Sequence, residues 1–452
     1  MNEKITKAQA AIMAGLLTLS LAACGGAASS SGNSSTGSTA ASSGSQAQVT
    51  GSSEVAASGV GSAVSDGVMS TADLFTERDM VQTADTSSAK QISVKDGENV
   101  SITEEGVYVL SGSAKNVTVT VNADSSAKVQ LVLNGLTIQN DSAPAVYVKS
   151  ADKVFVTTAE GTNNQLSVSG SFTPDGDTNL DAAIFSKDDL VLNGLGTLAI
   201  SSSANGVSSH DDLKITGGTY TIDSQADALE ANDNVLIASG DITIKTQKDG
   251  IHAENDEDNA VGNVYVAGGN LTITATEDAI QATVAAQVDG GVLSLKSAEG
   301  IEGTYVQIND GSVNIEASDD GVNATAKSTA YTPTIDVRGG NLTIKMASGD
   351  TDALDANGNI TISGGTVDIS AQSAFDYDGQ GTLSGGTVYV NGEQVSELQN
   401  SMMGGGMGGQ GRMGDMGGQG SMGGQGRMGD MGGQGSMGGQ GRMGTESTSK
   451  TA

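Results

Sequence analysis

The stretch NGVSSHDDLKITGGTYTIDSQA (residues 205–226) is followed directly by DALEANDNVLIASGDITIKTQK (residues 227–248), and the two lines share one layout. Each line holds two short apolar runs, at 213–215 and 220–222 in the first, separated by a glycine turn. These turn glycines recur at steps of 22, 22, 29, 22, 20, 29, 25 and 21 residues, at Gly196, Gly218, Gly240, Gly269, Gly291, Gly311, Gly340, Gly365 and Gly386. A repeat of this length indicates a stacked, quasi-one-dimensional fold.

The residue types indicate what kind of stack this is. Ile, Val, Leu and Tyr alternate with Thr at period two, which is typical of short strands and not of helices. The L-x-x-L-x-L-x-x-N signature of leucine-rich repeats is absent. We therefore expect an all-β fold, a right-handed parallel β-helix with coils of about 20–22 residues. The two steps of 29 predict loops around 254–262 and 327–333.

The charge balance narrows the class of partner. The chain has 53 Asp plus Glu against 21 Lys plus Arg, a net charge of −32. This excess argues against nucleic acid and against an anionic membrane surface as direct electrostatic partners. It is compatible with bound divalent cations, extracellular Ca²⁺ above all.

The N-terminus has the features of a lipoprotein signal peptide, residues 1–24. Lys4 and Lys7 precede an apolar run that ends in LAACG, and this ending resembles a bacterial lipobox with Cys24 as the lipidated residue. An ordinary signal peptide with an incidental cysteine is the alternative. Cys24 is the only cysteine, so no disulfide within the chain is possible. We expect a monomer anchored by lipid alone on the extracellular face of the bacterial cell membrane.

Composition divides the rest of the chain. Residues 25–70 are a Ser/Gly/Ala-rich linker that cannot bury a core. Residues 71–398 are the predicted β-helix, in which 71–80 could form a helical turn. Strands are also expected in 91–200, where they are less regular and the first of them would cap the helix. Alternatively, these strands would form a separate small β-sandwich. Residues 399–452 repeat MGGQGRMGDMGGQGS and predict a disordered tail, although its thioethers could collect Cu(I).

Acidic residues recur at the start of each coil and predict cation sites. An Asp column runs through the repeats with Gly300 interrupting it, and a second polar column stands three residues later and includes His252. In register, these columns stack carboxylates one strand spacing apart, and like charges so close need a bridging cation or protons. The predicted Ca²⁺ ligands are Asp227, Glu230, Asp249, Asp256, Asp258, Asp278, Glu299, Glu302, Asp319, Asp320, Asp352 and Asp355, with Asp188, Asp189, Asp211 and Asp212 as further candidates.

The same acids have a structural explanation. Asp before Gly or Ala in a tight turn bonds to nearby backbone and tolerates the turn geometry. For any single Asp a role in the turn is therefore at least as natural as a role in binding, and the two interpretations remain open for each residue.

Several segments in the same order resemble a known family. VQLVLNGLTIQN (129–140), AVYVKSADKVFVTTAEGTNNQL (145–166), AAIFSKDDLVLNGLGTLAI (182–200) and the lines that follow are similar to the carbohydrate-binding β-helix family of cellulolytic clostridia. The resemblance extends over roughly residues 100–392. It implies a pectate-lyase-like β-helix that binds Ca²⁺ and binds acidic plant polysaccharide and cellulose without clear lyase activity.

Residue chemistry leaves three functions open. No Ser-His-Asp, Cys-His or H-E-x-x-H arrangement is evident, so no catalytic residues are predicted. A Ca²⁺-dependent lyase would need a free Lys or Arg facing the metal, and Lys187, Lys214, Lys245 and Lys248 lie near acidic turns. With no Trp and few Tyr, a polyuronate such as polygalacturonate bridged through Ca²⁺ fits better than cellulose. We expect a non-catalytic polysaccharide-binding lipoprotein, with a lyase or a structural spacer or adhesin as alternatives.

Overall fold

The computed structural model describes residues 67–255, 258, 261–349 and 351–401. The predicted signal peptide with Cys24, most of the linker, Asp256 and nearly all of the predicted tail lie outside these residues. In the described part of the chain every regular element is a β-strand, and no helix there is long and apolar enough to cross a bilayer.

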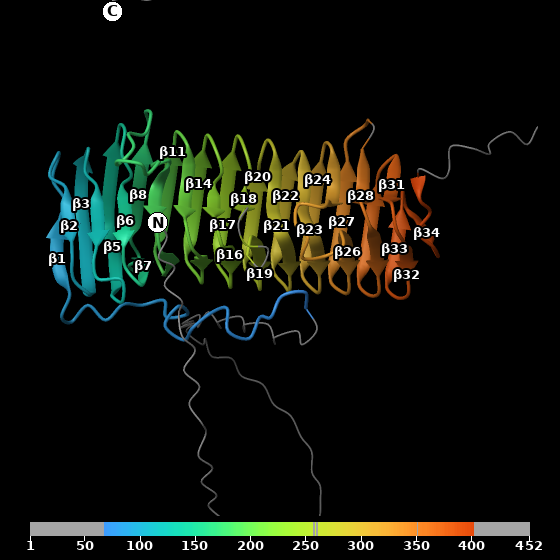
Figure 1. Cartoon of the computed structure of the whole chain (residues 1–452), viewed down its shortest axis with the longest axis horizontal. Coiled ribbons are helices and arrows are strands. Elements are labelled where there is room, and N and C mark those ends of the chain that lie inside the picture. The colour runs from blue at the N-terminus through green and yellow to red at the C-terminus, as the bar shows by residue number, and fades with distance from the viewer. Residues whose placement is uncertain (1–66, 256–257, 259–260, 350, 402–452) are drawn as a thin grey trace, which may run out of the picture. The chain divides into compact units, whose positions relative to one another are not determined.

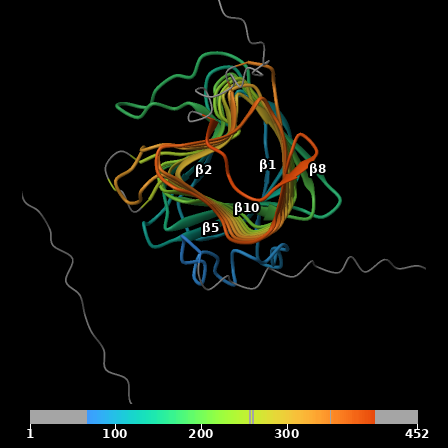
Figure 2. The same cartoon turned by 90° about the vertical axis from the view of Figure 1, so that its right-hand side faces the viewer.

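The strands stack in parallel into one solenoid of three sheets, which confirms the predicted parallel β-helix (Figure 1). Viewed along its axis, the solenoid has a roughly triangular outline (Figure 2). The chain passes through the three sheets, here named S1, S2 and S3, once per coil.

The strands of each sheet have the following bounds. S1 contains β1 (Lys90–Ser93), β7 (Lys153–Thr158), β10 (Asp189–Gly194), β13 (Leu213–Ile215), β16 (Asn234–Ile237), β19 (Asn263–Val266), β26 (Thr334–Val337), β29 (Asn359–Ile362) and β32 (Gly381–Leu383). S2 contains β8 (Asn163–Val168), β11 (Thr197–Ser202), β14 (Thr219–Ser224), β17 (Asp241–Thr246), β20 (Asn270–Thr274), β22 (Val292–Ser297), β24 (Ser312–Ala317), β27 (Asn341–Met346), β30 (Thr366–Ser370) and β33 (Thr387–Val390).

S3 contains β2 (Val100–Ile102), β4 (Val119–Asn122), β6 (Val146–Ser150), β9 (Ala182–Ser186), β12 (Asn205–Ser209), β15 (Leu229–Ala231), β18 (Ile251–Ala253), β25 (Asp320–Ala324), β28 (Asp352–Ala356) and β31 (Ser373–Tyr377). Four longer strands pass from one sheet into the next: β3 (Gly106–Lys115), β5 (Lys128–Asn140), β21 (Asp278–Val288) and β23 (Glu299–Ile308). The last strand, β34 (Glu393–Val395), folds back antiparallel on β33 and closes the C-terminal coil.

The N-terminal strands belong to the same solenoid. β1 pairs with β3, β2 with β4 and β3 with β5, all in parallel. The residues from 90 onward are therefore the first coils of the helix and not a separate β-sandwich.

Alternation along S2 explains the core. In β14 and β17 every second residue is buried and its neighbours are exposed. The buried positions stack from coil to coil, as in Ile222, Ile244 and Ile273, and form an aliphatic column along the axis. This arrangement is what the Thr/Ile alternation of the sequence predicts, because β-branched side chains pack well on a pleated half-buried surface.

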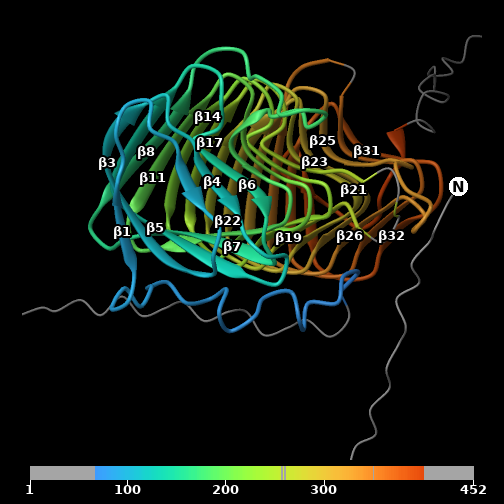
Figure 3. The same ribbon diagram turned by 60° about the vertical axis from the view of Figure 1, so that its left-hand side comes forward.

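The outer face of S1 is covered by chain that precedes the helix. Residues 67–82, the strap, run along S1 from the later coils toward the earlier ones (Figures 1 and 3). Val68 N–H donates to the buried Gln307 at 2.8 Å, and the Asp79 carbonyl accepts a hydrogen bond from the buried Thr216 hydroxyl. The helical turn considered for 71–80 is absent, since the strap is built from bends and turns.

The two predicted insertions are both loops between S3 and S1. One connects β18 to β19 and the other connects β25 to β26. Both therefore leave the solenoid at the corner between S3 and S1, after the S3 strands that follow the acidic residues.

Candidate functional site

Two ladders of polar side chains run along S3. The first ladder stands at or just before the start of each strand, and the second stands three residues later. The first comprises Asn205, Asp227, Asp249, Asp278, Glu299, Asp320, Asp352 and Ser373. The second comprises Ser208, Glu230, His252, Gln281, Glu302, Asn323, Asp355 and Asp376.

The first ladder differs from the predicted column at one coil. Asp278 pairs with Glu299, so Gly300 does not interrupt the ladder. The corner before Glu299 is one residue shorter than the corner before Asp278, because Thr274 pairs with Lys296. The acidic series is therefore continuous through this coil.

Three Asp of the first ladder, Asp227, Asp249 and Asp320, each use one oxygen for the fold. The backbone N–H of Asp249 donates to Asp227 Oδ1 at 3.0 Å, and that of Asp278 donates to Asp249 Oδ1 at 2.8 Å. Asp352 N–H donates in the same way to Asp320 Oδ1 at 3.1 Å. The structural role considered from the sequence is thus real for these three Asp, and it occupies only their Oδ1 atoms.

A small residue after each acid keeps this corner tight. A Cβ added to Gly250 would lie 2.6 Å from the carbonyl oxygen of Ala279 in the next coil. The main chain of successive coils therefore holds the carboxylates in close register.

One group of potential ligands, the histidine cluster, combines two coils. Asp227, Asp249 and His252 each offer an atom, and the three atoms lie within 4.8 Å of one another. His252 Nδ1 lies 3.5 Å from Asp227 Oδ2 and 3.7 Å from Asp249 Oδ2, while Nε2 lies 3.3 Å from Glu254 Oε2.

A second group, the carboxylate cluster, contains oxygen donors alone. Asp278, Glu299 and Glu302 each place an oxygen within 4.8 Å of the others. The Gln281 amide donates to Asp278 and to Glu302, both at 2.9 Å, and the Asn323 amide donates to Glu299 at 3.0 Å. Lys327 Nζ from the β25–β26 loop lies 2.6 Å from Glu302 Oε2.

Burial and mutual repulsion perturb these acids. Burial, followed by the charges of neighbouring acids, raises the pKa of Glu299 to about 7 and that of Asp355 to about 7. The same causes raise the pKa of Asp278 well above its ordinary range. Burial also raises the pKa of Asp320 to about 6. Without a counterion, this part of S3 therefore holds protons at pH values where exposed carboxyls are ionised.

The histidine cluster behaves differently. Burial alone would raise the pKa of Asp227, but His252 and Lys248 outweigh it and keep the pKa below its ordinary value. Burial would lower the pKa of His252, whereas Asp227, Asp249 and Glu254 raise it.

The structure brings together five of the predicted ligands in the two clusters and places the others as follows. Glu230 accepts a hydrogen bond from Asn205 at 2.5 Å, while Asp320, Asp352 and Asp355 continue the ladders beyond the carboxylate cluster. Asp319 is exposed beside the first ladder, Asp258 is exposed in the β18–β19 loop, and Asp256 lies outside the described residues.

The four further candidates lie at a different corner, between S3 and S1. Lys153 lies 3.3 Å from Asp189, and Lys214 lies 3.3 Å from Asp212. Asp188 accepts a hydrogen bond from the Ala151 backbone at 3.1 Å, and Asp211 is exposed. Among the described residues these acids form no group of three potential ligands.

His252 is the functional candidate that the predicted ligand set left out. The sequence pattern could have pointed to His252 as a ligand, because it stands three residues after Asp249, in the same column as Glu230 and Glu302. Only the folded register shows that its ring reaches two acids of different coils.

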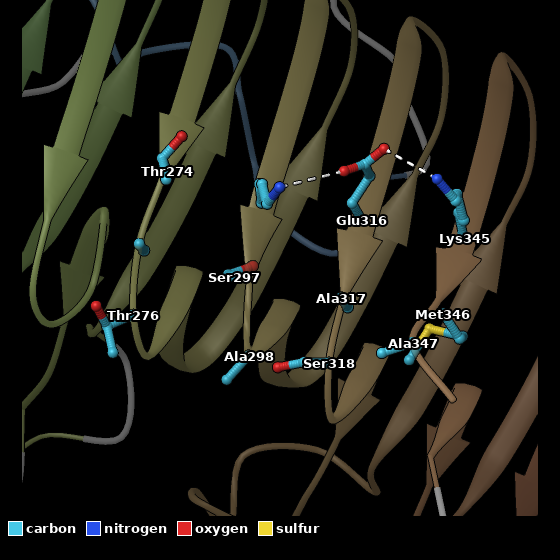
Figure 4. Close-up of a pocket in the computed structure, with 12 residues that line it drawn as sticks. Thr274, Thr276, Ser297, Ala298, Glu316, Ala317, Ser318, Lys345, Met346 and Ala347 are labelled. Carbon is cyan, nitrogen blue, oxygen red and sulfur yellow. Dashed lines mark ion pairs between the residues drawn. The ribbon is translucent and has the colours of Figure 1, made fainter. Parts of the chain in front are cut away.

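A shallow groove lies around the corner from the first ladder, at the ends of the S2 strands β20, β22, β24 and β27. Its volume is about 360 Å³, and small side chains such as Ala317, Ser318 and Ala347 form its floor (Figure 4). Glu316 lies 3.6 Å from Lys296 and 3.5 Å from Lys345, and all three side chains are largely exposed. Because Ala298 directly precedes Glu299, the groove and the carboxylate cluster flank the same corner.

The aromatic side chains of the described residues form no flat binding platform. Tyr220 and Tyr265 are buried, and Tyr389 is half-buried. Tyr331 is the only exposed aromatic residue in the described chain, and its ring packs edge-on against Tyr305.

Fold and ladders together define a parallel β-helix protein with an acidic face along S3. The model of the carbohydrate-binding domain-containing protein family matches residues 96–351 and 297–403, so the chain belongs to that family.

Two other proteins are similar to parts of this chain. A curated carbohydrate-binding domain-containing protein of Acetivibrio thermocellus is 35% identical over 130 residues, 28% of this chain and 45% of that protein. This chain thus spans less than half the length of that relative. A solved structure of the polysaccharide lyase-like protein from C. thermocellum, in a gadolinium derivative, aligns with a TM-score of 0.43 and 26% identity, over 57% of this chain and 97% of that one.

Proposed function

We propose that this protein is a cell-surface lipoprotein that binds acidic polysaccharide through Ca²⁺ held on S3, without cleaving it. The observation that carries the proposal is the carboxylate cluster, in which Asp278, Glu299 and Glu302 converge within 4.8 Å. Three carboxylates this close and largely buried repel one another unless a cation or protons intervene.

The donor set fits a hard cation. Carboxylate oxygens are the ligands that Ca²⁺ prefers, and it takes six to eight of them. Rotation of the Gln281 and Asn323 amides would present two further oxygens to the same point, and water or ligand oxygens would complete the shell. Asp320, Asp352 and Asp355 extend the acidic surface for additional ions.

The polysaccharide would lie along the solenoid axis, next to the cluster. Its carboxylates can share Ca²⁺ with S3, which also overcomes the repulsion expected for a chain of net charge −32. Lys296 and Lys345 at the groove of Figure 4 can bind further carboxylates. The absence of a row of exposed aromatic rings in the described chain disfavours crystalline cellulose, which proteins grip by stacking.

The lysines near the acids favour binding over elimination. A lyase needs an uncharged Lys to remove a proton. Burial would lower the pKa of Lys248, but Asp227, Asp249 and Glu277 raise it, so this ammonium stays charged at neutral pH. Lys327 is held in an ion pair with Glu302.

The lipid anchor at Cys24 and the extracellular location are part of this proposal. They rest on the LAACG ending of the apolar N-terminal run. A tether between the anchor and the β-helix would hold the acidic face away from the membrane.

The test uses the chain with Cys24→Ser, which removes the predicted lipidation site. Co-sedimentation with polygalacturonate is measured in Ca²⁺ and in excess chelator, while absorbance reports any unsaturated product. We expect chelator-sensitive binding and flat absorbance, and loss of binding in the Glu299→Gln/Glu302→Gln variant but not in the control Asp223→Asn, at an exposed acid of β14 on S2. Rising absorbance would identify a lyase instead, and no binding in Ca²⁺ would leave a spacer.

A further inference from the structure

The histidine cluster contains a buried side chain with no hydrogen-bond partner. His252 is 9% exposed, and neither ring nitrogen makes a hydrogen bond with any described residue. Buried polar atoms are normally bonded, so an imidazole left in this state between acids points to an absent ligand.

The surrounding contacts aim a nitrogen lone pair into the cluster. Nδ1 faces Asp227 Oδ2 at 3.5 Å and Asp249 Oδ2 at 3.7 Å, distances too long for good hydrogen bonds. Nε2 faces the Glu254 carboxylate at 3.3 Å. A proton on Nε2 is stabilised by Glu254, which leaves Nδ1 free as a ligand, the arrangement that protein metal sites commonly use to orient histidine.

The two aspartates are positioned by the main chain and not by the ligand. Their Oδ1 atoms already accept backbone N–H groups of the next coil, so the Oδ2 atoms remain for a metal. Lys248 Nζ lies 3.5 Å from Asp227 Oδ2, but its side chain is 46% exposed and can swing into solvent when a cation enters.

The donor set distinguishes this cluster from its neighbour. Ca²⁺ takes oxygen ligands, whereas imidazole suits Zn²⁺ and other first-row transition ions. Three protein ligands and an open position are a common arrangement for Zn²⁺. One coil further, the position of His252 is occupied by Gln281, and the donors there are all oxygens.

We propose that Asp227, Asp249 and His252 form a zinc site, with Glu254 as a positioning residue, separate from the oxygen-only carboxylate cluster. The β-helix then carries two adjacent cation sites of different selectivity on one face. This inference does not depend on the polysaccharide, because it rests on the geometry of the histidine cluster alone.

The experiment titrates Zn²⁺ into the Cys24→Ser chain by calorimetry, with Ca²⁺ present to fill oxygen sites. The Cys24→Ser change also removes the only thiol, which would otherwise compete for Zn²⁺. We expect one Zn²⁺ bound tightly, an affinity lower by roughly 100-fold in His252→Gln, and lower by roughly tenfold in Glu254→Gln. Glu302→Gln should leave the Zn²⁺ affinity unchanged while weakening Ca²⁺ binding.

Ring-nitrogen NMR provides a second measurement that is independent of the variants. The chain has two histidines, so His210 is an internal reference for His252. We expect Zn²⁺ to shift the His252 Nδ1 resonance alone. The proposal is overturned if Zn²⁺ shifts neither ring or only that of His210, or if His252→Gln binds Zn²⁺ as tightly as the parent. Retained Ca²⁺ binding in His252→Gln shows that this variant is folded.

Discussion

The outer faces of S1 and S3 both carry buried polar side chains, but they satisfy them in different ways. On S1, Gln307 accepts a hydrogen bond from Val68 of the strap and donates to Asp336 at 3.0 Å. Gln287 likewise accepts from Met69 and donates to Asp289, both at 2.9 Å. Backbone N–H groups of the strap therefore satisfy these buried amides of S1.

On S3 the corresponding side chains are mainly acids, and they face one another. Neighbouring carboxylates supply acceptors without donors, so they cannot satisfy each other as amides do. The strap therefore satisfies the buried amides of S1, whereas the acids of S3 have no such covering segment among the described residues. In the function proposed above, Ca²⁺ takes the place on S3 that the strap takes on S1.

The largest effect should follow from pH in the absence of Ca²⁺. The pKa of Glu299 and of Asp355 is about 7 in the folded chain, and the unfolded value is about 4. Between these values the folded state binds more protons than the unfolded state, so stability falls as pH rises from about 4 through 7. In chelator, we expect the melting temperature to be lower at pH 8 than at pH 5 by several degrees.

Ca²⁺ should remove most of this loss at pH 8, because it neutralises the same carboxylates. Replacement of Asp278 by Asn together with Glu299 by Gln should flatten the pH dependence in chelator, whereas Asp223→Asn, at an exposed acid of β14 on S2, should not change it. Equal melting temperatures at pH 5 and pH 8 in chelator would show that ionisation of the S3 acids does not destabilise the fold. The proposed difference between S1 and S3 would then be wrong.

The strap offers the next largest effect, on the S1 side of the comparison. Asp79 is fully buried, accepts a hydrogen bond from the Thr76 backbone at 2.9 Å and lies 3.4 Å from Lys153. Asp79→Ala should destabilise the strap by about 2 kcal/mol, since Lys153 retains Asp189 as a second partner. Limited proteolysis should then cut within 67–82 while the coils remain protected.

The exposed strap residue Asp73 supplies the matched control, and Asp73→Ala should leave the protease pattern unchanged. Polygalacturonate binding should be unchanged in Asp79→Ala, because the strap covers the outer face of S1 whereas the acidic ladders run along S3. Loss of binding in this variant would contradict the separation of the two faces.

The fold was predictable from sequence, because one alternation repeats in every coil. Ile222, Ile244 and Ile273 occupy equivalent positions along S2, and the glycine steps give the coil length directly. The strap was not predictable, since it forms no strand and its partners on S1 are distant in the sequence, as in the bond between Gln82 and Thr216, 134 residues apart.

The site was predictable in part. Columns of acids are visible in the sequence, but a register depends on each corner, and the loss of one residue before Glu299 moved it into line with Asp278. The two clusters also depend on side-chain direction, which periodicity does not specify. This is why His252 was placed in a column and yet left out of the predicted ligands.

The smallest effect should come from S2, whose outer face is neither covered by chain nor lined by stacked acids. Lys296 and Lys345 are about 70% exposed, at 68% and 70%, and both lie beside Glu316. Exposed charge pairs contribute about 1 kcal/mol or less, so Lys296→Ala should weaken polygalacturonate binding about threefold at low salt and less at high salt. Lys245→Ala, an exposed lysine of β17 outside the groove, is the matched control. Equal losses in the two variants would mean that the lysines attract the polymer by general charge. A loss confined to Lys296→Ala would show that the bound chain crosses the corner from the carboxylate cluster into the groove.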